Sequence, residues 1–488
     1  MISIRLGVPA DNAGAEPSGV LVCPVLAGND ATTPVATPPD QIAAEVAAFL
    51  VQTAHSGKAG EVETLPRPLR QPSKLLLVGV GPGDESGWRT AGAAIARAAS
   101  REKELAILVP ADLENTALRG LSEGIWLGEY AYRLRDAKPT EVRLLERVTV
   151  LADSNPEREE ILTAARVVTG QTNFARDLTN TPSIIKTPAW FVERVVEKLP
   201  AGVTVSVREP AQLAEEGFGG ILAVGGGSAK GPRLLEVSWQ PEGAGEHIVM
   251  VGKGITYDTG GIDIKPVEFM QLMRKDMGGA ATVLGATLAA AELGLRVRIT
   301  ALLPLAENMI SGSAWRSGDV VRHYGGLTSE VHSTDAEGRV VLADAMAYAV
   351  AHLEPDVLLD LATLTGASRV ALGMKTAALF SENAELVDSL TAAATAAGEK
   401  VWRLPLADEY AKDVAAEIAD LNNAAGNPGA ITAALYLREF AGLLRDRWAH
   451  IDMSAPSWSS SVDGELPKGA TGWGVRTLVR WLDARSTS

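Results

Sequence analysis

The chain contains a single cysteine, Cys23, among its 488 residues. A disulfide within the chain is therefore excluded, and so is a zinc site built from cysteine thiolates. Histidine is also scarce, and no HExxH motif, GxSxG motif or Ser-His-Asp pattern is present. We expect the six histidines to be structural or exposed: His55, His247, His323, His332, His352 and His450. Any hydrolytic chemistry would then rest on carboxylates and metal ions.

Positive charge is in short supply as well. Lys and Arg number 45 against 60 Asp and Glu, which gives a net charge of −15. This balance disfavours broad nucleic-acid binding, which needs a positive surface that displaces counterions. It is compatible with binding of divalent cations, although an acidic surface also serves solubility. We expect no nucleic-acid partner.

Long apolar runs are missing, although hydrophobic residues make up 46% of the chain. The start, MISIRLGVPADNAG, lacks the basic region and apolar run of a signal peptide. No stretch reaches the roughly 18 uninterrupted apolar residues that indicate a membrane span. The most apolar segment, 279–295, is rich in Ala and Gly and contains Glu292, which favours a buried helix. We therefore expect a cytoplasmic protein with no membrane partner.

Residues 1–165 are predicted to form a smaller N-terminal α/β domain. Short apolar runs alternate there with Ala-rich helical stretches at 42–53 and 89–100. The predicted strands lie at 20–27, 74–81, 105–110 and 142–152. The glycines of GVGPGDESG (79–87) miss the GxGxxG spacing, so a tight strand-to-helix turn is favoured over a phosphate cradle.

A long helix within 152–182 is predicted to connect this domain to a larger one, residues 166–488. Near-continuous apolar runs in the second part are typical of strands buried on both faces of a mostly parallel sheet. These runs lie at 247–252, 297–305, 357–364, 376–381 and 448–455, with helices such as 340–353 and 429–445 between them. The sequence therefore predicts a two-domain α/β protein.

Two segments concentrate unusual residues. In 251–287, an apolar strand ends in Gly-Lys-Gly, and Asp258, Lys265 and Asp276 follow. Charged groups after a buried strand lie at its carboxyl end, where open α/β sheets bind ligands. In 330–349, a short strand is predicted to precede Asp335, Glu337 and Arg339. These three alternate along the chain, and an extended backbone would place them on one side.

Each segment alone is also a good turn sequence, in which Asp caps the turn and Gly supplies positive φ. Four carboxylates with two lysines and an arginine are harder to explain as turns. Two divalent cations would supply the charge that compensates Asp258, Asp276, Asp335 and Glu337 if all four were buried together.

Both segments resemble the signature motifs of the leucine aminopeptidase family. The similarity is carried by GKGITYDTGGIDIKP (252–266), MRKDMGGAA (273–281) and TDAEGRVVLADA (334–345). Further similar motifs are RDLTNTPSIIKTP (176–188), ATLTGA (362–367), GAITAALYLREF (429–440), WAHIDMSAPSW (448–458) and KGATGWGVRTLV (468–479). The resemblance spans about 170–488. The N-terminal part has no comparable motif, but its α/β character is similar to the family's N-terminal domain.

The resemblance implies an aminopeptidase that removes the N-terminal residue of peptides, preferably Leu or a Met-like residue, by a water activated between two divalent metal ions. Mn²⁺, Zn²⁺ and Mg²⁺ all accept oxygen-rich ligands, so the choice of metal stays open. The implied ligands of the tighter ion are Lys253, Asp258, Asp276 and Glu337. Those of the more exchangeable ion are Asp258, Asp335 and Glu337.

Other roles are implied in the same way. Lys265 would stabilise the oxyanion, Arg339 would hold a bicarbonate, and the chain would assemble as a homohexamer. The pocket for the first substrate residue would be formed by Met273, Thr363, Leu364 and Gly366.

Two positions depart from the family pattern: Ser333 stands where the family usually has Asn, and Asp263 where Ser is common. Both lie close to implied site residues and put substrate positioning in question, but neither removes a ligand.

Two other functions stay open at this point. Another two-metal hydrolase, such as a phosphoesterase, would usually carry several histidines, and His332 is the nearest one here. Some members of the resembled family have a DNA-binding architectural role, against which the net charge of −15 and the lack of a basic run argue.

Overall fold

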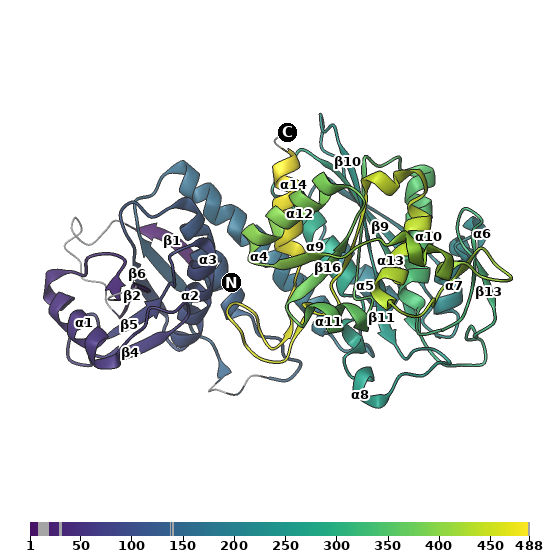
Figure 1. The fold of residues 1–488 in the computed structure, drawn as a ribbon. Helices are drawn as coiled ribbons and strands as arrows, with labels where there is room; N and C mark the ends of the chain where they lie inside the picture. Colours follow the sequence, from purple (N-terminus) through teal and green to yellow (C-terminus); the bar gives the residue numbers. More distant parts are fainter. Residues whose placement is uncertain (8–18, 29–31, 137, 139–140, 487–488) are drawn as a thin grey trace. The chain divides into compact units, whose positions relative to one another are not determined.

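The computed structural model describes residues 1–7, 19–28, 32–136, 138 and 141–486. These form two compact units (Figure 1). The first contains residues 1–170 together with 460–468, and the second contains 171–459 and 469–488. Helix α4 (Pro156–Asn180) runs through the division, as the predicted connecting helix requires. The return of 460–468 to the first unit is a feature that the sequence did not predict.

The first unit has a largely parallel sheet in the order β1-β7-β6-β2-β5-β4, with β3 paired to β2. Its strands are β1 (Ser3–Gly7), β2 (Val20–Leu26), β3 (Thr33–Pro34), β4 (Val62–Pro66), β5 (Lys74–Gly79), β6 (Glu104–Leu108) and β7 (Arg147–Leu151). The four predicted strands are β2, β5, β6 and β7. Strands β1, β3 and β4 were missed because they are short and only partly buried, and so lack a continuous apolar run.

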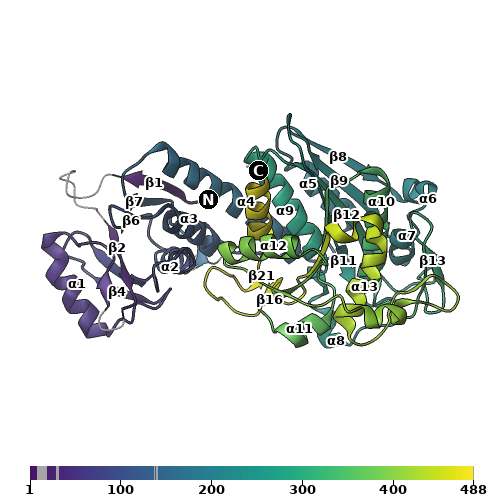
Figure 2. The ribbon, with the colours of Figure 1, turned by 45° about the horizontal axis from the view of Figure 1, so that its top comes forward.

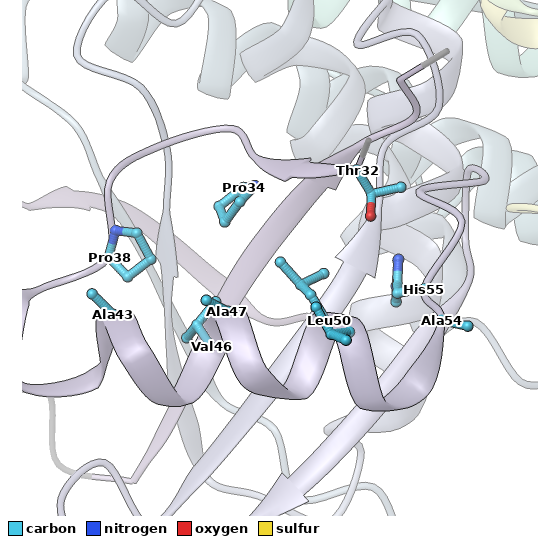
Figure 3. Close-up of a pocket in the computed structure, with 10 residues that line it drawn as sticks. Thr32, Pro34, Pro38, Ala43, Val46, Ala47, Leu50, Ala54 and His55 are labelled. Carbon is cyan, nitrogen blue, oxygen red and sulfur yellow. The ribbon is translucent and has the colours of Figure 1, made fainter. Parts of the chain in front are cut away.

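Helices cover both faces of this sheet (Figure 2). Helix α1 (Asp40–Thr53) packs Val46 and Leu50 on one face, while α2 (Glu85–Ala98) and α3 (Asn115–Glu129) cover the other. The turn after β5 is a strand-to-helix turn, as predicted, in which Asp84 accepts a hydrogen bond from Gly87 N (2.7 Å) and caps α2. A hollow of about 620 Å³ between α1 and Pro34 contains none of the candidate site residues (Figure 3).

The second unit is built on a nine-stranded sheet in the order β17-β16-β19-β15-β10-β12-β9-β8, with β11 paired to β12. Its strands are β8 (Val203–Arg208), β9 (Arg233–Trp239), β10 (His247–Gly252), β11 (Gly254–Asp258), β12 (Arg298–Asn308), β15 (Val357–Ala362), β16 (Thr376–Phe380), β17 (Lys400–Arg403) and β19 (Trp448–Asp452). The β10–β12, β10–β15, β15–β19, β11–β12 and β16–β17 pairs are parallel. The prediction of a mostly parallel central sheet is confirmed.

Short strands and helices complete this unit. The short strands are β13 (Val320–Arg322), β14 (Thr328–Glu330), β18 (Leu421–Asn422), β20 (Trp458–Ser459) and β21 (Gly469–Ala470). The helices are α5 (Pro188–Val196), α6 (Pro210–Glu216), α7 (Gly219–Gly225), α8 (Val267–Met270), α9 (Gly278–Glu292), α10 (Glu337–His352), α11 (Gly366–Leu372), α12 (Ala384–Ala397), α13 (Gly429–Ala441) and α14 (Val475–Ser486), with 3-10 turns η3 (Met273–Lys275), η4 (Asp408–Val414) and η5 (Gly442–Arg447). Among the described residues, no helix has the length and apolar character needed to cross a membrane.

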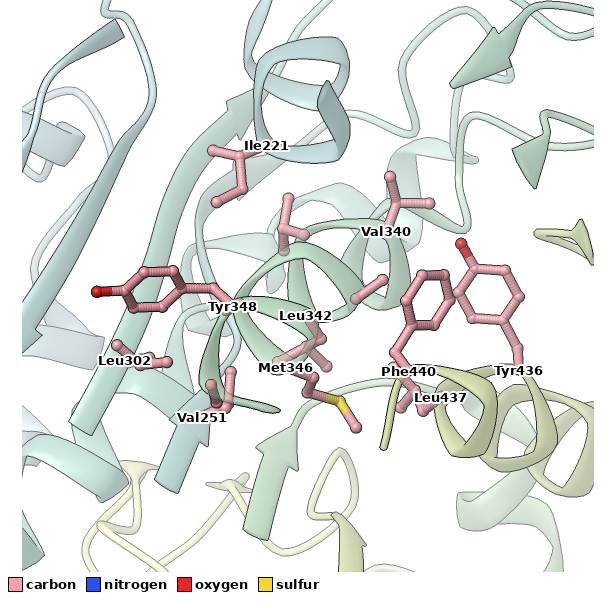
Figure 4. Packing of buried hydrophobic residues seen from close by; sticks show 14 of the residues in the cluster. Ile221, Val251, Leu302, Val340, Leu342, Met346, Tyr348, Tyr436, Leu437 and Phe440 are labelled. Atoms are coloured by element: carbon pink, nitrogen blue, oxygen red, sulfur yellow. The ribbon is translucent and has the colours of Figure 1, made fainter. Parts of the chain in front are cut away.

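Helices α9, α12 and α14 lie on one face of the sheet, and α7, α10 and α13 on the other (Figure 1). Helix α10 is held in the core through Val340, Leu342 and Met346, which pack with Tyr436 and Phe440 of α13 (Figure 4). This packing fixes the helix whose first turn carries Glu337 and Arg339.

The extended backbone predicted for 335–339 is wrong. Strand β14 ends at Glu330, and α10 begins at Glu337, so Glu337 and Arg339 lie two positions apart on a helix and do not share a side. The segment that follows is rich in Ala, which favours helix, and a glutamate in the first turn suits the positive end of the helix dipole. These preferences outweigh the alternation of charges.

Candidate metal centre

The candidate residues meet at the carboxyl edge of the large sheet. Lys253 follows β10, Asp258 ends β11, and Thr363 follows β15. Because these strands are parallel, their ends lie side by side, and Lys253 N donates to Leu361 O of β15 (2.9 Å). The site thus lies where open α/β sheets bind their ligands.

Lys253 lies between two buried carboxylates. Its Nζ is 2.9 Å from Asp276 Oδ2 and 2.8 Å from Glu337 Oε1, and it also donates to Thr363 O (3.2 Å). Asp276 Oδ1 in turn accepts from Thr363 Oγ1 (2.7 Å). Residues from three separate segments therefore converge on this one lysine.

Gly338 leaves the room that Lys253 needs. A Cβ built on Gly338 would lie only 2.6 Å from Lys253 Nζ and 2.5 Å from its Cε. The glycine of the motif TDAEGR is therefore required by a close approach, which the sequence alone did not indicate.

We expect Gly338→Ala to displace the Lys253 side chain from Asp276 and Glu337 and to lower activity about 10–100-fold, as loss of a supporting group at a metal site does. The reason is steric, since the helix has no other way to admit the methyl group. Activity assays at increasing Mn²⁺ concentration measure it. Gly285→Ala in α9, whose Cβ would have at least 3.2 Å to its neighbours, is the matched control, and equal losses in both variants would contradict the steric explanation.

Lys265 pairs with a second set of carboxylates. Its Nζ lies 2.7 Å from Asp258 Oδ2 and contacts Asp335 Oδ1. The other oxygen of Asp258 accepts from Gly260 N (2.8 Å) and from Asn308 Nδ2 (2.8 Å). Asn308 also donates to Thr334 O (3.0 Å), so it ties β11 to the loop before Asp335. Sequence reasoning missed Asn308.

The pKa values of these groups reflect crowding of like charges in a buried place. Burial raises the pKa of Asp276 to about 6, against the opposing effect of Lys253. Burial and then Glu337 hold the pKa of Asp258 well above its usual range, and the same two causes raise the pKa of Asp335. Burial opposes the charge on both lysines, but the surrounding carboxylates outweigh it and raise the pKa of Lys253 and Lys265.

This donor set fits divalent cations. One carboxylate oxygen each from Asp258, Asp335 and Glu337 lies within 4.8 Å of the others. Apart from their ion pairs with Lys253, Asp276 Oδ2 and Glu337 Oε1 receive no hydrogen bond within the described part of the chain. The raised pKa values of Asp258, Asp276 and Asp335 indicate carboxylates that added positive charge would stabilise. For Glu337, burial is outweighed by Lys253 and Lys265, which lower its pKa and keep it ionised.

Arg339 is enclosed beside this cluster. Its Nη1 donates to Asn423 O (2.8 Å), whereas its Nε has no hydrogen-bond partner among the described residues. Burial lowers the pKa of Arg339, but a guanidinium remains protonated at neutral pH. A half-buried cation with an unsatisfied N–H is suited to a small anion.

The two departures from the family pattern both act on the loop before Asp335. Asp263 Oδ2 accepts from Thr334 N (2.7 Å) and from Ser317 Oγ (3.0 Å). These hydrogen bonds, that of Thr334 foremost, lower the pKa of Asp263. Ser333 Oγ accepts from Asp335 N (3.2 Å). Both side chains therefore support the backbone that carries Asp335.

The candidate pocket residues lie on two neighbouring segments. Met273 is half-buried at the start of η3, and Thr363, Leu364 and Gly366 form the loop from β15 into α11. This loop is held by Asp452, at the end of β19, which accepts from Leu364 N (3.1 Å) and Thr365 N (3.0 Å). Sequence reasoning missed this role of Asp452.

Four histidines are buried: His55 lies in the first unit, and the other three lie in the second unit and contact other side chains. His323 pairs with Asp344 (3.0 Å), His450 with Asp360 (2.5 Å), and His247 Nε2 lies 3.0 Å from Thr300 Oγ1. None of these three is among the residues that surround Lys253 and Lys265, in agreement with the expected structural role.

Fold and site together define an α/β protein with a carboxylate-rich centre suited to divalent metal ions. The catalytic-domain model of the cytosol aminopeptidase family matches residues 173–479, and the family's N-terminal-domain model matches 25–136. The chain belongs to the cytosol aminopeptidase family. It is accordingly a metal-dependent aminopeptidase, and the resemblance to the leucine aminopeptidases is confirmed.

Known sequences and structures agree with this family. A probable cytosol aminopeptidase of Micrococcus luteus is 42% identical over 457 residues, covering 88% of each chain. One of Corynebacterium diphtheriae is 40% identical over 447 residues, covering 89% of this chain and 87% of its own. The bottromycin maturation enzyme BotP in complex with Mn has a TM-score of 0.85 at 36% identity and 96% and 99% coverage. A mutant of tomato leucine aminopeptidase has a TM-score of 0.86 at 31% identity, with 99% and 97% coverage.

Proposed function

We propose that the buried cluster holds two divalent cations and that the chain uses them to remove Leu or Met-like residues from peptide N-termini. The observation that carries this proposal is the convergence of four carboxylates and two lysines at one edge of the sheet. The manganese in the BotP complex supports Mn²⁺ as one of the metals, beside Zn²⁺ and Mg²⁺.

The proposed ligand sets are those that the family resemblance implies. Lys253, Asp258, Asp276 and Glu337 would hold the tighter ion, and Asp258, Asp335 and Glu337 the more exchangeable one. Lys253 must lose a proton to become a ligand, which a nearby cation favours. Bound together, two such ions lower the pKa of a shared water and polarise the scissile carbonyl.

Other residues of the chain would orient and stabilise the reacting groups. Lys265, which the carboxylates keep protonated, would face the oxyanion that develops as the peptide carbonyl is attacked. The loop at Thr363 would place the substrate beside Asp276, to which Thr363 Oγ1 is bonded. Met273, Leu364 and Gly366 would line the pocket for the first residue, where apolar walls favour Leu and Met.

Arg339 would hold a bicarbonate. The unsatisfied Nε and the half-buried position of the guanidinium support a small anion there. Such an anion would provide a proton acceptor in a site that has no catalytic histidine.

Two further properties are proposed from the relatives. Relatives named cytosol aminopeptidases support a cytoplasmic location. A homohexamer is the assembly implied by the family resemblance, and light scattering of the purified protein would measure its mass.

Removal of metal should abolish hydrolysis of leucine-p-nitroanilide, because neither lysine can replace the cations as a Lewis acid. Treatment with EDTA followed by addition of Mn²⁺, Zn²⁺ or Mg²⁺ tests this. We expect at least one of these ions to restore activity. Full activity in EDTA, with metal content confirmed as negligible by plasma emission, would contradict the proposal.

A blocked N-terminus should prevent cleavage. The free amine is the group that the exchangeable ion would bind, and an acetyl group would remove its lone pair from use. Comparing hydrolysis of Leu-Gly-Gly with that of its acetylated form measures the effect. Equal rates for the two peptides would indicate an endopeptidase.

A further inference from the structure

Asn423 is a fully buried residue directly after β18, far along the chain from the metal-binding motifs. Strand β18 pairs with β14 in register, Glu330 opposite Asn422, and Asn423 N donates to Glu330 O (3.2 Å). This pairing brings Asn423 beside the segment that leads from β14 into Asp335.

The side-chain amide of Asn423 makes three hydrogen bonds to the backbone of that segment. Its Oδ1 accepts from His332 N (2.8 Å) and from Ser333 N (3.2 Å), and its Nδ2 donates to Ser333 O (2.7 Å). The amide thus pairs with the backbone as a neighbouring strand would. The pattern needs a donor and an acceptor in fixed places, which only an amide of this length supplies.

The main-chain carbonyl of Asn423 holds a different element. It accepts a hydrogen bond from Arg339 Nη1 (2.8 Å). One residue therefore contacts both the loop that carries Asp335 and the half-buried Arg339 in the first turn of α10.

We propose that Asn423 is a positioning residue for the reaction, which sets the Asp335 loop and Arg339 relative to each other. The inference rests on the proposed function, in which Asp335 binds the exchangeable metal and Arg339 an anion. The inference requires that substitutions at Asn423 weaken metal binding at the exchangeable site. Metal binding at the tighter site should not change, because the hydrogen bonds of Asn423 given above go to neither Lys253 nor Asp276.

Asn423→Asp is the sharpest test because it preserves the side-chain volume and the two hydrogen bonds that Oδ1 accepts. It replaces the donor Nδ2 by an oxygen that faces Ser333 O, and the two oxygens repel each other. Asn423→Ala removes the amide without adding charge, and it decides the matter by the same criterion if the aspartate variant does not fold. Asn422→Asp is the matched control. Within the described part of the chain, Asn422 Oδ1 accepts one hydrogen bond, from Ala424 N (2.8 Å), and a carboxylate would keep it.

The experiment is a calorimetric titration of metal-free full-length protein with Mn²⁺, followed by steady-state kinetics at saturating Mn²⁺. For both Asn423 variants we expect the weaker Mn²⁺ site to lose about 10–100-fold in affinity, the usual effect of removing a group that supports a ligand. We expect the tighter site and the Asn422→Asp control to be unchanged, and excess Mn²⁺ to restore part of kcat. If Asn423 had a purely structural role, its substitution would lower thermal stability and would not change the Mn²⁺ affinity of one site more than that of the other.

Asp335→Ala, titrated in parallel, separates failure of the inference from failure of the proposed function. If Asp335→Ala loses the weaker site while the Asn423 variants bind like the wild type, the inference is overturned and the metal centre stands. If Asn422→Asp weakens the weaker Mn²⁺ site as much as the Asn423 variants do, the loss is a general effect of added charge and the inference is overturned. If Asp335→Ala keeps both sites, the ligand assignment is overturned, and the inference with it.

Discussion

Asp258→Ala and Glu337→Ala should each abolish metal-dependent hydrolysis. In the proposed centre these two carboxylates bridge the ions, so the loss of either removes a ligand from both. Each is also buried within the cluster, and its removal would leave Lys265 or Lys253 with one paired carboxylate instead of two. Hydrolysis of leucine-p-nitroanilide and metal content by plasma emission measure the two consequences together.

Asp319→Ala is the control for this pair of variants. Asp319 pairs with Arg316 at the surface, three residues away, and exposed pairs of this kind contribute little to stability. It should retain full activity and full metal content. Full activity in Asp258→Ala or Glu337→Ala would remove the two-metal mechanism.

Lys253 and Lys265 should respond to substitution in opposite ways. Lys253→Ala should weaken the tighter metal and be partly rescued by excess Mn²⁺, because this lysine is proposed to act as a neutral ligand. Lys265→Ala should keep its metals and much of its substrate affinity but lose kcat by about 10²–10³, the usual effect of removing one oxyanion donor. Metal titration and steady-state kinetics on both variants measure the difference.

The structure gives each lysine a reason for its assignment. Lys253 is enclosed between Asp276 and Glu337, with side chains on every side, whereas Lys265 is more open to solvent and contacts the partly exposed Asp335. Loss of metal in Lys265→Ala together with retention in Lys253→Ala would reverse the two roles.

The sequence predicted the core of the fold well, because strands buried on both faces carry continuous apolar runs. β10, β15 and β19 are of this kind. Strand β8 alternates between exposed and half-buried positions at the edge of the sheet and gives a much weaker signal. The alternating charges at 335–339 suggested an extended backbone, but α10 begins at Glu337. Helix formation there overrides a local pattern of period two.

The residues of the site also fall into those that the sequence predicted and those that it did not. The charged residues proposed as ligands stand in short, recognisable motifs, so the sequence could point to them. Their supporting residues could not be predicted, because Asn308 and Asn423 reach the site only through the pairing of distant segments. The sequence alone does not show which groups an asparagine at a strand end will bond. Gly338 lay in a quoted motif, but only the path of Lys253 explains it.

The central claim is that this cluster of carboxylates and lysines binds two metal ions. Calorimetric titration of the metal-free protein with Mn²⁺, with the stoichiometry checked by plasma emission, tests it most directly. We predict two Mn²⁺ per chain of unequal affinity, and only the tighter one in Asp335→Ala. A wild-type protein that is active with one ion per chain, or with none, would contradict the account.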